Sequence, residues 1–219
     1  MKRENALLII AGPSAVGKTT IAYSLIERDK SYEFVRSVTT RASRGDAYDA
    51  EYIYITVPEF QQLIENGGVL EHTEYAGNFY GTPRSEVERI LSEGKIPLLV
   101  LDINGVGSLV KNAGSLNPCG VYVYDDLSVI EKRLFERFIG DTPTPEGQKK
   151  YEGRKSQNIA DFSGIIDTAP RFFAFIANKG TVEETSYAVE GAFKSFVEGE
   201  MRDDAKIAET AMALKASVK

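Results

Sequence analysis

Short apolar runs alternate along the chain with segments whose apolar residues recur at helical spacing. Residues 7–10 and 96–102 are nearly continuous apolar runs, which are typical of strands buried on both faces. Further strands are predicted at 120–124 and 172–176, and helices at 127–138 and around the apolar positions Ile21, Leu25, Ile26, Val189, Phe193 and Val197. Because strands alternate with helices, we predict an α/β fold in which a parallel sheet is flanked by helices on both faces.

The segment from about residue 37 to residue 82 interrupts this alternation and is rich in strand-like residues. Strands are predicted at 34–41, 51–55 and 69–75, with helices at 58–64 and around Val87, Ile90 and Leu91. We therefore expect an inserted lobe that stands apart from the main sheet.

The last third of the chain is more polar. Residues 140–153 contain two prolines and three glycines and have no apolar periodicity, so we predict a loop or lid, followed by a polar helix that begins at Arg154. Residues 198–219 carry apolar positions at helical spacing. They predict a C-terminal helix that packs on the core or on another subunit.

The first predicted strand leads directly into a sequence that matches a phosphate-binding loop. Residues 12–19 read GPSAVGKT and fit the pattern G-x-x-x-x-G-K-[ST] between a strand and a helix. Glycines in such a loop let successive backbone N–H groups converge on phosphates at the positive end of the following helix. Lys18 can reach the β- and γ-phosphates, and the Thr19 hydroxyl can bind Mg²⁺. The residues expected to hold a nucleoside triphosphate are Gly12, Pro13, Ser14, Ala15, Val16, Gly17, Lys18, Thr19 and Thr20.

Two further sites suit phosphate chemistry, and each also has an interpretation that involves no ligand. Arg41 and Arg44 lie close together near Ser37, and guanidinium groups bind phosphate oxygens in pairs, so the cluster suits a second phosphate. An exposed polar loop is the other interpretation. Asp102 ends the apolar run 96–102, where an aspartate acts on Mg²⁺ in phosphate-loop enzymes, and a helix N-cap or turn residue is the alternative.

The composition is that of an ordinary soluble protein, with 42% hydrophobic and 26% charged residues among 219. A net charge of −6 disfavours nucleic acid and anionic membranes as partners. The single cysteine, Cys119, excludes an internal disulfide and fits a reducing compartment. The apolar run near the N-terminus is too short for a signal peptide or a membrane span. We therefore expect a cytoplasmic protein with neither nucleic acid nor membrane as a partner.

Taken together, these segments resemble the guanylate kinase family, in order and in spacing, from the N-terminus to about Gly105. The matching blocks are GPSAVGKTT, SVTTRASR, the strand around Tyr52, LEHTEYAGNFYGTPRSEV and LLVLDING. The second and fourth blocks are the most specific, because they match the GMP-binding lobe of the family. From residue 125 to residue 197 the resemblance is weaker, and the tail extends beyond the usual family length.

The resemblance implies roles for individual residues on the acceptor side. Glu71 and Thr82 match residues that read the guanine edge, since a carboxylate accepts from N1–H and the 2-amino group and a hydroxyl donates to O6. Adenine offers no matching donors and would leave Glu71 unpaired. The residues that match the GMP-phosphate site of the family are Ser37, Arg41, Arg44, Tyr52 and Tyr80.

On the donor side the resemblance concerns the lid and the adenine site. Arg137 and Arg154 match lid arginines, although the segment between them is longer than usual, and Asn178 matches the asparagine near the adenine of ATP. The implied architecture is that of a P-loop nucleoside monophosphate kinase. Its parts are a guanylate kinase-like domain 1–197, with a core 1–36, 95–136 and 164–197, a GMP-binding lobe 37–94 and a lid 137–163, and then a helical tail 198–219.

The activity implied by the resemblance is transfer of the γ-phosphoryl group of ATP to GMP, with Mg²⁺ held near Thr19 and Asp102. The acceptor is an anionic phosphate oxygen and needs no general base, so catalysis consists of positioning and charge neutralisation. The residues assigned to catalysis are Lys18, Arg41, Arg137 and Arg154. Two alternatives stay open: a kinase for another monophosphate, such as dGMP or a phosphorylated sugar, and a non-catalytic module that binds protein partners. The sequence is compatible with a monomer or a homo-oligomer.

Overall fold

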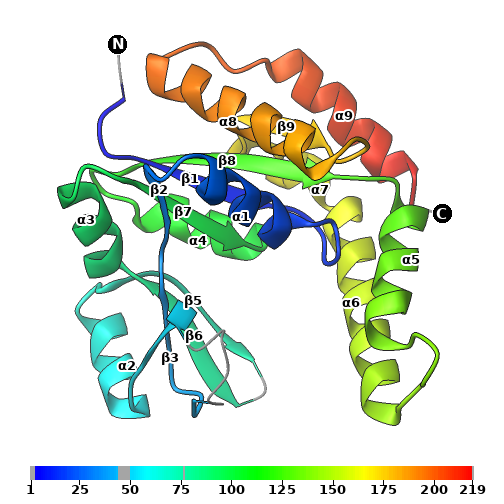
Figure 1. Cartoon of the computed structure of the whole chain (residues 1–219), viewed down its shortest axis with the longest axis horizontal. Helices are drawn as coiled ribbons and strands as arrows, with labels where there is room; N and C mark the ends of the chain where they lie inside the picture. Colours follow the sequence, from blue (N-terminus) through cyan, green and yellow to red (C-terminus); the bar gives the residue numbers. More distant parts are fainter. Residues whose placement is uncertain (1–2, 44–49, 76, 219) are drawn as a thin grey trace.

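The computed structural model describes residues 3–43, 50–75 and 77–218, with Tyr75 described by its backbone alone. Its centre is a five-stranded parallel sheet in the order β2-β7-β1-β8-β9 (Figure 1). The strands are β2 (Tyr32–Phe34), β7 (Ile96–Leu101), β1 (Ala6–Ala11), β8 (Asn117–Tyr124) and β9 (Ala174–Ala177). The predicted α/β fold with a parallel sheet is therefore confirmed.

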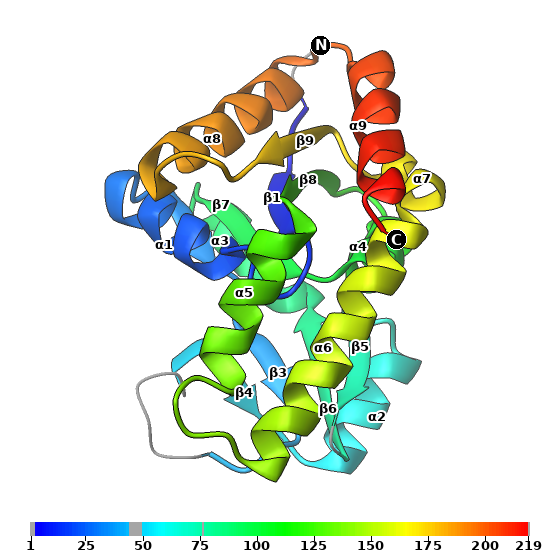
Figure 2. The same ribbon diagram turned by 90° about the vertical axis from the view of Figure 1, so that its right-hand side faces the viewer.

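Helices cover both faces of this sheet (Figures 1 and 2). On one face α1 (Lys18–Arg28) and α8 (Val182–Glu198) pack against each other, and on the other face lies α4 (Ile103–Asn112). Strands covered in this way are apolar on both sides, which explains the continuous apolar runs in the sequence. In β1, for example, Ile9 is fully buried and lies opposite Leu99 of β7.

A second sheet of four strands forms the inserted lobe, which lies below the core in Figure 1. Its order is β4-β3-β6-β5, with β3 parallel to β4 and antiparallel to β6. The elements of the lobe are β3 (Ser37–Thr39), β4 (Tyr52–Tyr54), α2 (Val57–Glu65), β5 (Val69–Tyr75) and β6 (Asn78–Pro83), after which α3 (Arg84–Ser92) leads back to the core. Phe60 of α2 packs with Val38 and Val69 into a small core of its own.

The strand predicted at 34–41 is wrong as a single element, because the structure contains two strands there. β2 ends at Phe34 and pairs with β7 in the core, whereas β3 begins at Ser37 and pairs with β4 and β6 in the lobe. Val35 and Arg36 carry the chain from one sheet to the other. Strand-like alternation continues through this crossing, so the pattern does not reveal the change of sheet.

Two helices, α5 (Leu127–Phe138) and α6 (Pro145–Ser163), project from the core as a hairpin opposite the lobe (Figure 1). The loop predicted at 140–153 is wrong over most of its length, because α6 begins well before Arg154. The Thr144 hydroxyl caps this helix by accepting a backbone hydrogen bond of 3.0 Å, and proline suits its first turn. The first half of α6 extends away from the core and needs no apolar face, so the sequence shows no helical periodicity there.

The C-terminal tail forms a helix, α9 (Asp204–Ala216), that packs on the core. Packing on the core was one of the two arrangements predicted for it. It buries Ile207, Ala211 and Leu214 against β9 and the base of α6. Two short helices, α7 (Ile165–Thr168) and η2 (Ala169–Arg171), precede β9, which begins two residues later than predicted. Within the described ranges, no helix is long and apolar enough to cross a membrane.

Candidate active site

The phosphate loop lies at the carboxyl end of β1 and leads into α1. At Gly12, with φ 149°, a Cβ atom would lie 2.1 Å from the carbonyl oxygen of Val123 in β8, so only glycine fits there. Ala15 has φ 67°, which is the left-handed region that costs a non-glycine residue about 1 kcal/mol. Contacts around the loop must offset this strain. They hold the loop backbone in one irregular path before the N-terminus of α1.

Lys18, the first residue of α1, folds back over the loop. Its ammonium group donates hydrogen bonds to the carbonyl oxygens of Gly12, at 2.8 Å, and Pro13, at 2.9 Å. Burial lowers the pKa of Lys18 to about 8, while the carboxylates of Asp102 and Asp161 oppose the shift and the lid arginines add to it. The lysine is therefore mostly a cation at pH 7 and loses its proton in mildly alkaline solution.

Asn178, predicted to lie near the adenine of ATP, turns its buried side chain toward the phosphate loop. Its Nδ2 donates to the carbonyl oxygen of Val16 at 2.8 Å, and its Oδ1 accepts from the Thr185 hydroxyl of α8 at 2.8 Å. Both ends of the amide thus hold the loop against α8. The residue also lines a cavity that contains Lys18 and Arg137.

Arg137 and Arg154, the two predicted lid arginines, approach the phosphate loop from the two helices of the hairpin. Arg137 of α5 lines the cavity that contains Lys18 and Thr19. Arg154 of α6 lines a neighbouring cavity that contains Lys18 and Asp102. The two helices of the hairpin therefore bring arginines from different parts of the sequence to the cavities around Lys18, and Arg133 of α5 lines the first of them as well.

Asp102 follows β7 and begins α4. Its Oδ1 accepts a hydrogen bond from the Gly105 N–H at 2.7 Å, so the N-cap interpretation of this residue is correct. A cap uses one carboxylate oxygen and leaves the other for a second role. The side chain lines both the cavity that contains Lys18 and the cavity that contains Glu71. The two cavities thus meet at the end of β7, where Asp102 is one of the residues that line both.

A cavity of about 270 Å³, called the acceptor cavity after the role that the resemblance implies for it, lies between β5 and β6 of the lobe and the end of β7. Glu71 lines this cavity, whereas Thr82 lines a wider one next to α1. Glu71 of β5 and Thr82 of β6 face each other in the antiparallel ladder, and the Thr82 hydroxyl donates to Glu71 Oε1 at 2.6 Å. Both side chains are buried, and burial raises the pKa of Glu71, while the bonds from Thr82 oppose that shift and Asp102 adds to it. The structure thus brings together the two residues predicted to read the base.

The predicted GMP-phosphate residues come from three adjacent strands of the lobe. Ser37 of β3 pairs with Tyr52 of β4, and the Tyr52 ring lies 6.2 Å from that of Tyr80 in β6. The guanidinium carbon of Arg41 lies 5.2 Å from the Tyr52 ring centroid, and the group donates to the hydroxyl of Tyr54 at 3.2 Å. Four of the five residues therefore gather on the lobe.

The fifth, Arg44, lies outside the described residues.

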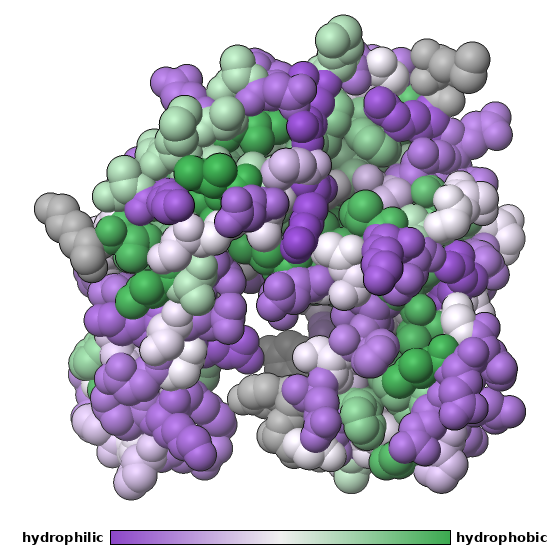
Figure 3. Space-filling view, turned by 180° about the vertical axis from the view of Figure 1, so that it is seen from behind, coloured by the Kyte–Doolittle hydropathy of each residue, from purple (hydrophilic) through white to green (hydrophobic). Residues whose placement is uncertain are grey.

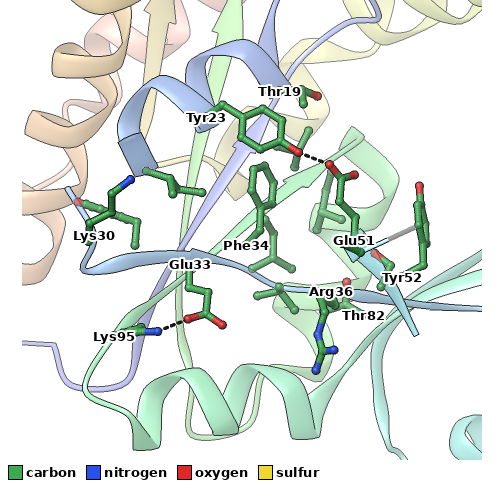
Figure 4. Close-up of a pocket in the computed structure, with 18 residues that line it drawn as sticks. Thr19, Tyr23, Lys30, Glu33, Phe34, Arg36, Glu51, Tyr52, Thr82 and Lys95 are labelled. Carbon is green, nitrogen blue, oxygen red and sulfur yellow. Dashed lines mark hydrogen bonds and ion pairs between the residues drawn. The ribbon is translucent and has the colours of Figure 1, made fainter. Parts of the chain in front are cut away.

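A wide cavity of about 1040 Å³ opens between α1 and the lobe (Figure 4). Tyr23 of α1 and Phe34 of β2 pack at its wall with ring centroids 5.1 Å apart, and the Tyr23 hydroxyl donates to the Glu51 carboxylate beside Tyr52. Thr19 lines the same cavity. The cavity therefore reaches from the phosphate loop to Ser37 and Tyr52, two of the residues predicted to bind the phosphate of GMP.

From behind, the molecule is hollowed below the core, between the lobe and the α5–α6 hairpin, and hydrophilic side chains border the hollow (Figure 3). The cavities around Lys18 and Glu71 lie at the carboxyl ends of core strands, where ligands bind in open α/β sheets. Two polar projections around a shared hollow suit charged substrates that must be brought together and shielded from water.

Several residues at the site were missed by the sequence-based prediction, among them Arg133 of α5. Tyr54 lies two residues after Tyr52 in a strand, and this spacing, which puts both rings on one face, is a signal that could have found it. Asn158 and Asp161 lie in α6 and line the cavity around Lys18. The polar sequence around them gives no sign that they belong to the site, because their partners lie far away in the sequence.

Comparisons with known proteins agree with the fold. The family model described as guanylate kinase matches residues 4–195. A solved guanylate kinase from Anaplasma phagocytophilum has the same fold, with a TM-score of 0.59 and 24% identity over 92% of this chain and 90% of that one. The match ends before α9, which lies outside the part that the family model describes.

Curated guanylate kinases of several bacteria are also similar to this chain. The relative from Streptococcus thermophilus (strain CNRZ 1066) is 34% identical over 200 residues, covering 87% of this chain and 91% of the relative. The relative from Lactococcus lactis subsp. lactis (strain IL1403) is 28% identical over 211 residues, covering 94% of this chain and all of the relative. Because the guanylate kinase family model matches most of this chain, the chain belongs to the guanylate kinase family.

Proposed function

We propose that this protein transfers the γ-phosphoryl group of MgATP to GMP, giving ADP and GDP. The observation that carries the proposal is the position of Asp102, which borders both the phosphate-loop cavity and the cavity lined by Glu71. A donor site with Lys18 and an acceptor site that suits guanine thus adjoin at the end of β7. This is the arrangement that direct transfer between two nucleotides requires.

Transfer to a phosphate oxygen depends on charge and alignment, because the acceptor is already an anion. Lys18 and the backbone N–H groups of the loop would bind the donor phosphates, and Arg41 the phosphate of GMP. Arg137 and Arg154 would approach the transferring group from the two helices of the hairpin. Closure of the hairpin and the lobe over the hollow would exclude water, which would otherwise hydrolyse ATP.

Mg²⁺ is the metal that this activity implies, and the donor groups present suit it. Mg²⁺ prefers oxygen ligands and binds through one or two protein groups together with phosphates and water. Thr19 offers a hydroxyl beside the loop and Asp102 a carboxylate at the end of β7. In the described part of the chain, no group of three His, Cys, Asp or Glu residues is placed to hold a metal ion. The ion would neutralise charge on the transferring phosphates.

Base selection follows from the buried pair. Ionised Glu71 can accept from guanine N1–H and the 2-amino group, and the Thr82 hydroxyl can turn toward O6. The raised pKa of Glu71 reflects the cost of burying its charge, which the two guanine donors would offset. Adenine presents an acceptor at N1 and no 2-amino group, so it would leave the carboxylate unpaired.

We further propose that the protein acts in the cytoplasm on free nucleotides, as a monomer or a homo-oligomer, with neither nucleic acid nor membrane as a partner. The net charge of −6 supports this, as does the buried thiol of Cys119, whose burial suits a reduced, unreactive cysteine. dGMP stays an alternative acceptor, because no described contact distinguishes ribose from deoxyribose. A phosphorylated sugar is disfavoured, since it would leave Glu71 and Thr82 without a base to read.

A coupled assay for ADP release, with MgATP and GMP, dGMP, AMP, UMP or CMP offered separately, tests the proposal. Turnover confined to the guanine monophosphates is expected. Binding of GMP without ADP release would contradict the kinase and favour a non-catalytic binding module instead. Turnover with AMP equal to that with GMP would contradict the assignment of base selection to Glu71.

A further inference from the structure

Asn158 is a polar side chain that α6 buries against the phosphate loop. It is 1% exposed, its Oδ1 accepts a hydrogen bond from the Ser14 N–H at 2.8 Å, and its Nδ2 donates to the Ser14 carbonyl at 3.2 Å. One amide thus satisfies both polar groups of a single backbone residue. A buried amide with both ends bonded holds its partner in one geometry, because any displacement leaves buried groups unpaired.

The first half of the loop needs such support. Ala15, next to Ser14, lies in the strained left-handed region, and the Val16 N–H reaches the Pro13 carbonyl only at 3.4 Å. Lys18 also bonds to this half, through the carbonyls of Gly12 and Pro13. When Lys18 turns to bind nucleotide phosphates, those carbonyls lose their donor, whereas the bonds from Asn158 do not depend on the nucleotide.

The position of Asn158 in α6 links the loop to the lid. One turn earlier, Arg154 lines the cavity around Lys18, and one turn later, Phe162 is fully buried in the core. Residues four apart lie on the same face of a helix, so the arginine and the amide both face the loop. Contact between Asn158 and Ser14 therefore sets where Arg154 stands relative to the donor phosphates.

We propose that Asn158 is a positioning residue of the donor site, which holds the Ser14–Ala15 backbone in its nucleotide-binding shape and fixes the base of the lid helix to the loop. The proposal deepens the proposed function and rests on it. Asn158 acts through Ser14 and does not itself touch the reacting atoms.

The test measures ADP binding by calorimetry and hydrogen exchange at the Ser14 amide, neither of which requires turnover. Asn158→Ala should weaken ADP binding about tenfold, accelerate exchange at Ser14, and leave GMP affinity unchanged. In turnover assays the KM for ATP should rise while that for GMP stays near the value of the unmodified protein. A variant with a lower melting temperature but unchanged ADP affinity would overturn the proposal, since the role would then be structural.

Two further variants separate hydrogen bonding from packing. Asn158→Leu fills a similar space without polar groups, so it keeps the core filled and should bind ADP as weakly as Asn158→Ala. If it instead binds ADP as the unmodified protein does, packing alone is sufficient and the proposal fails. Ser156→Ala, at an exposed position of the same helix, is the matched control and should change neither ADP affinity nor Ser14 exchange. Absence of turnover in the unmodified protein would contradict the kinase assignment, while the binding measurements would still test Asn158.

Discussion

The Thr82 hydroxyl and the Glu71 carboxylate are joined by a 2.6 Å hydrogen bond across the β5–β6 ladder, at a position buried from solvent. The threonine therefore stabilises a buried charge before any base is present. In the proposed function, the two donors of guanine would share the carboxylate, and the hydroxyl would turn toward O6. Selectivity would then arise because a base without these donors leaves a buried carboxylate short of partners.

Glu71→Ala should lower kcat/KM for GMP by about a hundredfold and narrow the preference for GMP over AMP. The variant loses the acceptor for guanine N1–H and the 2-amino group, whereas AMP loses nothing by the change. Steady-state kinetics with both monophosphates measure the effect. Glu74→Gln is the control, since this exposed residue lies on the opposite face of β5. In this variant the preference for GMP over AMP should persist. Undiminished discrimination by Glu71→Ala would mean that the base is read elsewhere.

Lys18→Ala should reduce kcat by about a thousandfold and leave the dissociation constant for GMP unchanged. The ammonium group should supply charge to the donor phosphates, whereas the phosphate of GMP is assigned to side chains of the lobe. Turnover measured with MgATP, together with GMP binding by calorimetry, separates the two effects. Unchanged turnover would refute the donor site assigned here, and lost GMP binding would show that the change disturbs the acceptor cavity.

The pKa of Lys18, lowered to about 8 by burial, predicts proton uptake when a nucleotide binds in alkaline solution. Phosphates favour the charged lysine, so above pH 8 the neutral side chain must gain a proton on binding, and ADP affinity should fall by up to tenfold per pH unit. Below about pH 7 the lysine is already charged and this uptake should vanish. Calorimetry in buffers of different ionisation enthalpy measures the protons directly, with Lys18→Met as the control that takes up none at this position.

The parts of the fold that could be predicted from the sequence are those fixed by local pattern. Apolar runs such as 7–10 in β1 are strands because helices cover both faces, and the loop after them is recognisable because phosphate chemistry demands glycine and lysine at fixed spacing. The pairing of Glu71 with Thr82 follows from a short hairpin, in which neighbours in sequence become neighbours in space.

What could not be predicted depends on contacts between distant segments. Ser14 and Asn158 are 144 residues apart, and an asparagine in a polar helix gives no sign of its partner. The crossing at Val35 and Arg36 was missed because alternation continues while the strand changes sheets. The first half of α6 was missed because a helix that projects from the core carries no apolar stripe.

Glu86→Gln should destabilise the junction between core and lobe. Arg36, in the crossing from β2 to β3, makes two hydrogen bonds to Glu86 of α3, at 2.7 and 3.2 Å. Burial by itself raises the pKa of Glu86, but the bonds from Arg36 and Arg89 outweigh it and lower the pKa to about 2. At pH 7 the variant should lose about 2 kcal/mol in free energy of unfolding. This figure is smaller than the pKa shift alone would imply, because both arginines are partly exposed to solvent.

The pH dependence of that effect has a defined sign. Because the folded pKa lies below the unfolded value of 4.5, the stabilisation from Glu86 is complete above about pH 4.5 and disappears as the pH falls toward 2. Denaturant unfolding of the unmodified protein and of Glu86→Gln should therefore converge in acid. Glu88→Gln, exposed on the same helix, should change stability by less than about 0.5 kcal/mol at any pH, and curves that stay parallel for Glu86→Gln would contradict the ion pair.

Ile207→Ala, in α9, should lower the free energy of unfolding by about 2–3 kcal/mol while leaving turnover unchanged well below the melting temperature. Ile207 is 6% exposed and belongs to the main core, so its truncation leaves a cavity. No residue of α9 lines the cavities around Lys18 or Glu71, and the helix should therefore stabilise the fold without contributing to chemistry. Met212→Ala, on the exposed face of α9, should have an effect below about 0.5 kcal/mol. A fall in kcat at unchanged stability would instead mean that α9, through its contact with α6, governs the movement of the lid.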